Sequence, residues 1–284
     1  MGALNPIKAQ SSAVIRVSGF SSPRNPAPLS GFIPSDLYEE DYAETLRNSL
    51  LTSSNFGSEG IVKCTIDLKP FVNTISAGSL VSGGRRVVDV FFAGMIRNSL
   101  SLGEVDELVA FIQAGGVVYI SGDGESAASG VRYNTLFSTL SISDSFPNEL
   151  IDFHPSGSSS DPIDTQVTDG PFGSVEPIHH SYFNPINTSS LQSVAYGFEE
   201  LDFIGFSIDP DLQGVETDGE IGLLQSDYFR TILAEGSFGS GYLSVSGLPF
   251  YLWEGAENNQ KYFLNLFALG CKVEEGKQLN VPLF

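Results

Sequence analysis

Apolar residues form a short, almost unbroken run at 87–93 and another at Val117–Ser121, and this pattern predicts two strands buried on both faces. Between the runs, Ser101 and Glu104 form a capping box, and apolar residues then recur on one helical face up to the glycines at 115–116. A strand, a crossover helix and a second strand in this order are typical of a right-handed βαβ unit. The chain is therefore expected to contain a mainly parallel sheet, with these two strands in its interior and helices on both faces.

Weaker patterns on either side of this unit predict the remaining elements. Further strands are expected at 13–17, at 61–68 near a sheet edge, and at four short runs, 193–196, 203–208, 221–224 and 242–245. Those four runs either complete the main sheet or add a small antiparallel one. Helices are expected after a cap at Ser35, at 131–140 and at 258–269. Because 141–190 is largely without periodicity, we expect one α/β domain over 1–284 with an irregular insertion there.

The charge of the chain narrows the classes of partner. Its 284 residues include 14 Lys and Arg against 34 Asp and Glu, which gives a formal net charge of −20. This charge repels phosphate backbones and anionic lipid headgroups, so neither nucleic acid nor a membrane surface is expected as a partner. No apolar run reaches the roughly 20 residues of a membrane-spanning helix. The acidity itself is typical of a protein that stays soluble in a secreted or salty setting.

The N-terminal residues and the two cysteines bear on the cellular compartment of the protein. The first residues, MGALNPIKAQSS, have neither the basic flank nor the apolar core of a signal peptide, which leaves open an export signal removed earlier. Cys64 and Cys271 form either a disulfide in an oxidising compartment or two buried thiols. Because their spacing matches no metal or redox motif, we expect free thiols. The localisation stays open, with an extracellular or periplasmic location favoured.

Several stretches resemble a known superfamily. They are the apolar strand with Asp89, SLGEVDELVAFIQAGGVVYISGD, DGPFG at 169–173, and GSGYLSVSGLPFYLWEGAENNQKYFLNLF near the end. Together these resemble the class I glutamine amidotransferase-like superfamily, in branches akin to trehalose-utilisation-like and gliding-motility auxiliary domains. The resemblance covers about Asp89 to Leu269, and Asn259, Phe263 and Asn265 match the way such domains end. It implies a flavodoxin-like three-layer sandwich.

The resemblance does not extend to the catalytic nucleophile. The amidotransferases carry a cysteine on the sharp turn after the strand that corresponds to VVYIS, whereas this turn holds Gly122, Asp123 and Gly124. A carboxylate cannot replace the thiolate that glutamine hydrolysis requires. Ser121 and Ser126 flank the turn without a G-x-S-x-G elbow. Glutaminase activity and serine hydrolase activity of the elbow type are therefore not expected.

The same loop is nevertheless the first candidate for a site, because open parallel sheets bind ligands beyond the carboxyl ends of their strands. Its predicted ligand-binding residues are Gly122, Asp123, Gly124 and Ser126. Asp123 and Glu125 are either paired carboxylates for acid-base or metal chemistry or, the alternative we favour, ordinary polar residues that cap the next helix.

Two adjacent histidines complete the catalytic candidates. His179 and His180 can supply a general base or a ligand beside Asp123, but neighbouring side chains of an extended segment point opposite ways, so at most one faces a given site. A structural or surface role is the favoured alternative for each. Two function hypotheses follow. The leading one is a non-catalytic binding or structural module that recognises a protein or glycan partner through its loops. The rival is a glycan or amide hydrolase that uses Asp123, Glu125 and one histidine.

A separate acidic stretch suggests a cation. From Asp209 to Glu220 the sequence approaches the D-x-[DN]-x-[DN]-G-x5-E calcium loop, with Asp209, Asp211, Gln213 and Glu220 as the ligands. The favoured alternative is an acidic surface turn, since short motifs recur by chance in an acid-rich chain. Both flanks also look like strands rather than the helices of an EF-hand. The expected cofactor is accordingly none, or Ca²⁺ at these four residues.

Overall fold

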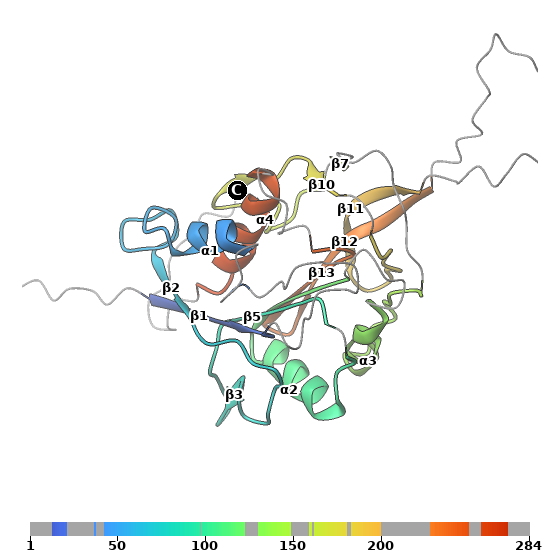
Figure 1. Ribbon diagram of the computed structural model, residues 1–284, viewed down its shortest axis with the longest axis horizontal. Helices are drawn as coiled ribbons and strands as arrows, with labels where there is room; N and C mark the ends of the chain where they lie inside the picture. The colour runs from blue at the N-terminus through green and yellow to red at the C-terminus, as the bar shows by residue number, and fades with distance from the viewer. Residues whose placement is uncertain are drawn as a thin grey trace, which may run out of the picture.

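A seven-stranded sheet lies at the centre of the part of the chain that the structure describes (Figure 1). This computed structural model describes residues 13–21, 37, 43–96, 98–122, 130–148, 159–160, 162–180, 183–199, 228–249 and 257–271. The strands are β1 (Ala13–Gly19), β2 (Cys64–Leu68), β5 (Val90–Gly94), β6 (Val117–Ser121), β11 (Gln192–Glu199), β12 (Tyr228–Phe238) and β13 (Gly241–Ser246). Their order across the sheet is β11-β12-β13-β6-β5-β1-β2.

The predicted interior of this sheet is confirmed. Strand β6 pairs in parallel with β5 and with β13, and β1 pairs in parallel with β5 and β2. Every residue of β5 and β6 is buried, as expected for strands covered on both faces. The runs predicted at 193–196 and 242–245 fall within β11 and β13, and they complete the main sheet as its antiparallel edge with β12.

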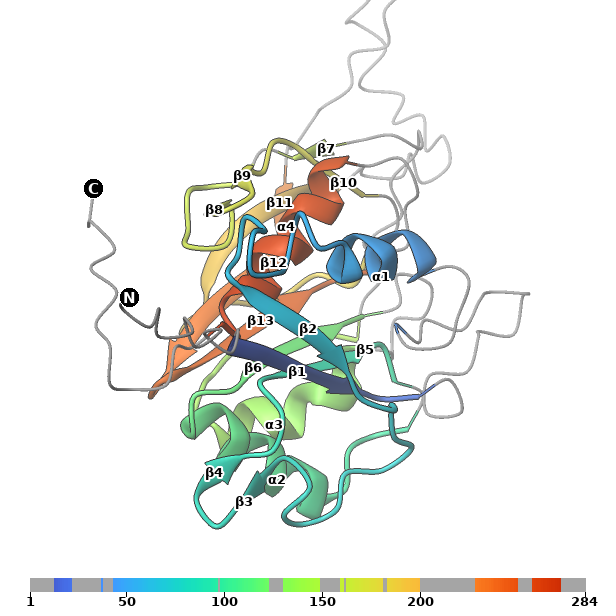
Figure 2. The same ribbon diagram turned by 90° about the vertical axis from the view of Figure 1, so that its left-hand side faces the viewer.

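Helices cover both faces of the sheet and produce a flavodoxin-like three-layer α/β sandwich (Figure 2). Helices α1 (Glu44–Leu51) and α4 (Glu257–Ala268) lie on one face, and α2 (Leu102–Gln113) and α3 (Asn134–Thr139) lie on the other. Each face therefore has its own apolar core. One core joins Leu46, Phe92 and Phe263, and the other joins Phe91, Leu108 and Leu136.

Helix α2 begins with the predicted capping box and anchors the loop before β5. The Ser101 side chain accepts a hydrogen bond from Glu104 N, and Glu104 Oε2 accepts one from Ser101 N at 2.8 Å. One turn later, Glu107 accepts from the backbone N–H groups of Gly78, Leu80 and Val81. Burial raises the pKa of Glu107, but these three hydrogen bonds outweigh it and lower the pKa below the ordinary value. The charged carboxylate thus satisfies backbone donors that no strand pairs.

The remaining elements are short. Strands β3 (Val81–Ser82) and β4 (Arg85–Arg86) form a hairpin whose two turn residues are glycines with positive φ. Within 141–190, the two-residue strands β7 (Ser159–Ser160), β8 (Asp169–Gly170), β9 (Gly173–Ser174) and β10 (Ile178–His179) pair as β7 with β10 and β8 with β9. The helix predicted at 131–140 is a 3-10 turn, Gly130–Tyr133, followed by α3. The division into one domain with an insertion stays a prediction.

Strand β12 was not predicted, because Arg230, Glu235 and Gly236 interrupt its apolar positions, although it is 11 residues long. The predicted cap Ser35 and the runs at 203–208 and 221–224 lie outside the described residues. Helix α1 begins at Glu44, and the N-cap residue before it, Ala43, makes no side-chain capping bond. Among the described helices, none is long and apolar enough to cross a bilayer.

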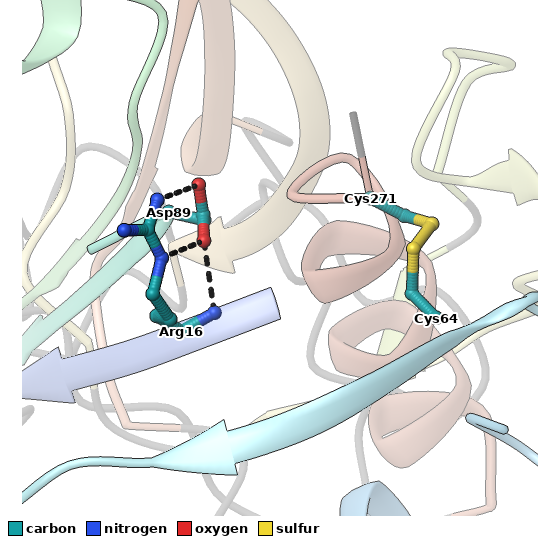
Figure 3. The surroundings of a disulfide bond; sticks show 4 residues. All are labelled: Arg16, Cys64, Asp89 and Cys271. Atoms are coloured by element: carbon teal, nitrogen blue, oxygen red, sulfur yellow. Dashed lines mark hydrogen bonds and ion pairs between the residues drawn. A yellow bond between two sulfur atoms is a disulfide. The ribbon is translucent and has the colours of Figure 1, made fainter. Parts of the chain in front are cut away.

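The prediction of two free thiols is wrong. Cys64 of β2 and Cys271, just beyond α4, form a disulfide with their Cα atoms 5.9 Å apart (Figure 3). The pairing could not be predicted, because the two cysteines are separated by 207 positions and local patterns carry no information on which distant elements meet. The same figure shows Arg16 of β1 binding the buried Asp89 through its backbone N–H and its guanidinium. Both contacts fix the β1–β2 end of the sheet.

Candidate functional site

The predicted ligand-binding end of the sheet lies beyond the carboxyl ends of β6 and β13. Gly122 directly follows β6, and its N–H donates to Ser246 O at 2.9 Å. The other predicted loop residues, Asp123, Gly124, Glu125 and Ser126, lie outside the described residues, so their roles stay predictions. What the structure adds is the surroundings of Gly122.

Gly122 is covered by a segment that is distant in sequence. A Cβ placed on Gly122 would lie 2.3 Å from Asn184 Oδ1 and 2.7 Å from the Gly247 carbonyl oxygen. Asn184 is fully buried and held in place, because its N–H donates to Gly247 O at 2.8 Å. The first position after β6 therefore has no space for any side chain, including a nucleophile.

Substitution of Gly122 should therefore be costly. We expect Gly122→Ala to lower the free energy of unfolding by about 1–3 kcal/mol, because the added methyl group overlaps backbone and a fixed amide. Gly103→Ala is the matched control: its Cβ would meet nothing within 4 Å, and alanine favours a helix interior. Urea denaturation of both variants measures the difference. Equal stabilities of Gly122→Ala and the wild type would show that this end of the sheet is open.

Polar side chains next to Gly122 are buried as well. Tyr119 Oη and Ser246 Oγ share a hydrogen bond of 2.7 Å, and Ser246 Oγ donates to Leu248 O. Ser121 is fully buried, and within the described structure its hydroxyl has no hydrogen-bond partner. Ser121 is thus shielded from solvent, and no base among the described residues is bound to it.

The two candidate histidines lie in different surroundings. His179 is half-buried in β10, and helix α4 binds its backbone: Asn259 Oδ1 accepts from His179 N at 3.0 Å, and Asn259 Nδ2 donates to His179 O at 3.1 Å. His180 is buried, and its ring packs edge-on against Phe183 with a centroid distance of 5.8 Å. This difference agrees with the expectation that adjacent side chains point opposite ways. A catalytic role for either histidine stays a prediction.

Helix α4 holds the preceding loop at a second point in the same manner. Asn265 Oδ1 accepts from Phe172 N at 2.8 Å, and Asn265 Nδ2 donates to Gly173 O at 3.1 Å. Asn259 and Asn265, which the resemblance singled out, therefore act on backbone groups of the 172–179 stretch. Both side chains are fully buried, so their amides are committed to the fold.

No group of three or more His, Cys, Asp or Glu side chains that is suited to hold a metal occurs among the described residues. The four residues of the predicted calcium loop, Asp209, Asp211, Gln213 and Glu220, all lie outside that part of the chain. Calcium binding there stays a prediction.

Sequence reasoning missed a buried cluster of titratable groups on the α4 face of the sheet. Glu235 of β12 is 2% exposed, and its two oxygens accept hydrogen bonds from Tyr242 Oη of β13, at 2.6 Å, and from Tyr262 Oη of α4. Tyr262 Oη also shares a hydrogen bond of 2.7 Å with Ser244 Oγ. Burial raises the pKa of the Glu235 carboxyl, while hydrogen bonds from Tyr242, Tyr262 and Thr165 oppose that rise only in part. Burial, reinforced by Glu235, raises the pKa of both phenols. A strand assignment for β12 was the missing signal, since it places Glu235 on the covered face.

Comparisons with known proteins show the fold alone. No family model matches the chain, and no curated protein matches it. Among solved structures, the mmIFT52 N-terminal domain is similar with a TM-score of 0.50 and 14% identity over 72% of this chain and 85% of that one. The cold-adapted beta-galactosidase from Rahnella sp. R3 is similar with a TM-score of 0.51 and 11% identity. That match covers 89% of this chain but only 30% of the enzyme.

Proposed function

We propose that this chain is a non-catalytic binding or structural module on an amidotransferase-like α/β scaffold, and that it recognises a protein or glycan partner. The observation that carries this proposal is the closed position at Gly122. The amidotransferase nucleophile would stand on the turn after β6, but Asn184 and the Gly247 carbonyl occupy the space beside Gly122. With no thiol on that turn and the neighbouring Ser121 fully buried, the scaffold retains its core without the parts of a covalent catalyst.

The disulfide supports a location outside the reducing cytosol. Stable structural disulfides persist in oxidising compartments, where secreted and periplasmic proteins reside. Cys64 is fully buried in the core and Cys271 is partly buried, so small thiols have restricted access to the bond. We therefore propose an extracellular or periplasmic location for the module. The large negative charge is compatible with it.

The rival hydrolase is tested by activity. Wild-type protein and Asp123→Ala are assayed side by side against glutamine, simple amides and esters, and a set of glycosides, with melting temperatures to confirm that both are folded. We expect no turnover above the blank for either protein. Turnover by the wild type that disappears in a folded Asp123→Ala variant would overturn the proposal in favour of the hydrolase that uses Asp123, Glu125 and a histidine.

A further inference from the structure

A small cavity lies at the end of the sheet opposite to Gly122. It has a volume of about 170 Å³ and is bordered by Val117, the first residue of β6, and by the turn between β12 and β13. Tyr242 contributes to its wall from β13, Gln166 from the loop before β8, and Leu269 from the end of α4. The cavity thus joins four separate segments of the chain, and Tyr242 belongs both to its wall and to the Glu235 cluster.

The wall combines neutral polar groups with apolar ones. The lining residues are Gln166 with an amide, Ser237 and Ser240 with hydroxyls, and Tyr242, whose hydroxyl already donates to Glu235, together with the apolar Val117 and Leu269. None of the lining residues that the structure describes carries a formal charge. Convergent hydroxyl and amide groups beside apolar surface are typical of sites that orient a neutral ligand through hydrogen bonds.

The nearby carboxyl group does not provide a free charge for a cation. Both Glu235 oxygens already accept from phenols, and Glu235 itself is 2% exposed. Its bond to Tyr242 Oη fixes the orientation of that phenol, which is 7% exposed. An anionic ligand is disfavoured by the net charge of −20 and by the absence of a cation among the described lining residues.

We propose that this cavity binds a neutral, hydroxyl-rich small molecule, namely a sugar residue or a polyol. Its volume is below the roughly 300 Å³ at which drug-sized sites begin, and it is partly open to solvent, so it would contact no more than a single sugar ring. The inference rests on the proposed binding function and names the ligand class. The ligand comes either as a free sugar or as the terminal residue of a glycan, and both present the same hydroxyl groups.

Saturation-transfer NMR with the full chain tests the inference. The probes are glucose, galactose and glycerol as neutral ligands, glucuronate and glucosamine as charged comparators, and an oligosaccharide that ends in each sugar. We expect transfer to at least one neutral probe and none to the charged comparators. Tighter binding of an oligosaccharide than of its terminal sugar identifies a glycan as the source, and equal binding identifies a free sugar.

Two variants and one control locate the site. Ser237→Tyr places an aromatic side chain in the cavity on an exposed strand position, which β-structure accepts, and Gln166→Leu removes the amide. We expect each variant to raise the Kd for the neutral probe by about tenfold or more. Ser82→Tyr, an exposed strand serine outside the cavity, should bind as the wild type does.

The failures of the two proposals are distinct. Absence of transfer to every neutral probe, or equal transfer by the wild type and a folded Ser237→Tyr variant, overturns this inference and leaves the proposed function untouched. Wild-type turnover that disappears in a folded Asp123→Ala variant overturns the proposed function, whatever the NMR result.

Discussion

Replacing both Cys64 and Cys271 with alanine is expected to lower the free energy of unfolding by about 3–5 kcal/mol. The bond closes a loop of the chain with a sequence separation of 207, and long loops lose the most conformational entropy in the unfolded state when they are cross-linked. It also holds the end of α4 against β2, which is an edge strand of the described sheet and pairs there with β1. Loss of the bond therefore loosens an edge of the sheet as well.

Urea denaturation of three samples measures this effect: oxidised wild type, reduced wild type, and the double variant. The reduced wild type and the double variant should unfold at similar urea concentrations, well below the oxidised protein. Alkylation in denaturant without reductant, followed by mass spectrometry, provides the direct check, and we expect no label. Two alkylated cysteines in unreduced wild type would contradict the disulfide and the proposed oxidising compartment together.

The second large effect is expected at Glu235. Glu235→Ala should cost about 3–5 kcal/mol, because it leaves a cavity and removes the acceptor from two buried phenols, each worth about 1–3 kcal/mol when unsatisfied. In this variant Ser244 still binds Tyr262, and Gln166 and Thr165 remain as hydrogen-bond partners of Tyr242. Chemical denaturation near neutral pH measures the cost. A loss below about 1 kcal/mol would contradict the role of Glu235 as the centre of the cluster.

Glu235→Gln keeps the shape of the side chain but removes its titratable carboxyl group. The pKa of Glu235 is raised in the folded protein, so between the ordinary unfolded value, about 4.3, and the folded value the native state binds more protons than the unfolded state. This contribution to stability is fully present below the unfolded pKa and is lost as pH rises through the folded pKa. The stability of the wild type relative to Glu235→Gln should therefore fall as pH rises through this window, by at most about 1.4 kcal/mol for each unit of pH.

Paired urea titrations of the two proteins from acid to neutral pH test this sign. Glu59→Gln, at an exposed position, serves as the matched control and should show little change relative to the wild type. A stability advantage of the wild type over Glu235→Gln that grows with pH would mean that the carboxyl is held charged in the folded protein.

Local patterns predicted the centre of this fold but not its closing edge. Strands β5 and β6 are continuous apolar runs, and Ser101 with Glu104 marks the start of α2, so each is readable within a few residues. Strand β12 carries an acid whose burial makes sense only beside Tyr242 and Tyr262, which folding brings from other elements. In the sequence, a strand that contains a buried carboxyl shows the same interrupted pattern of apolar residues as a loop.

In the candidate site, too, some features follow from the local sequence and others only from the folded structure. That the turn after β6 lacks a thiol or hydroxyl nucleophile follows from the residues at 122–124 alone. That Gly122 is closed follows only from the approach of Asn184, which is distant in sequence and carries no local signal for that contact. The disulfide and the cavity beside Tyr242 also depend on segments that meet only in the folded chain.

The order of strands across the sheet has a consequence for synthesis on the ribosome. Val117 of β6 pairs with Val90 of β5 on one side, but its partner on the other side, Tyr242, emerges only after a further stretch of more than a hundred residues. In the nascent chain, β2, β1, β5 and β6 have all emerged while one edge of the fully buried strand β6 is still unpaired. Such an edge is a template for aggregation. We therefore expect the yield of this protein to depend on chaperone protection of β6 during translation, until the β12–β13 hairpin covers that edge.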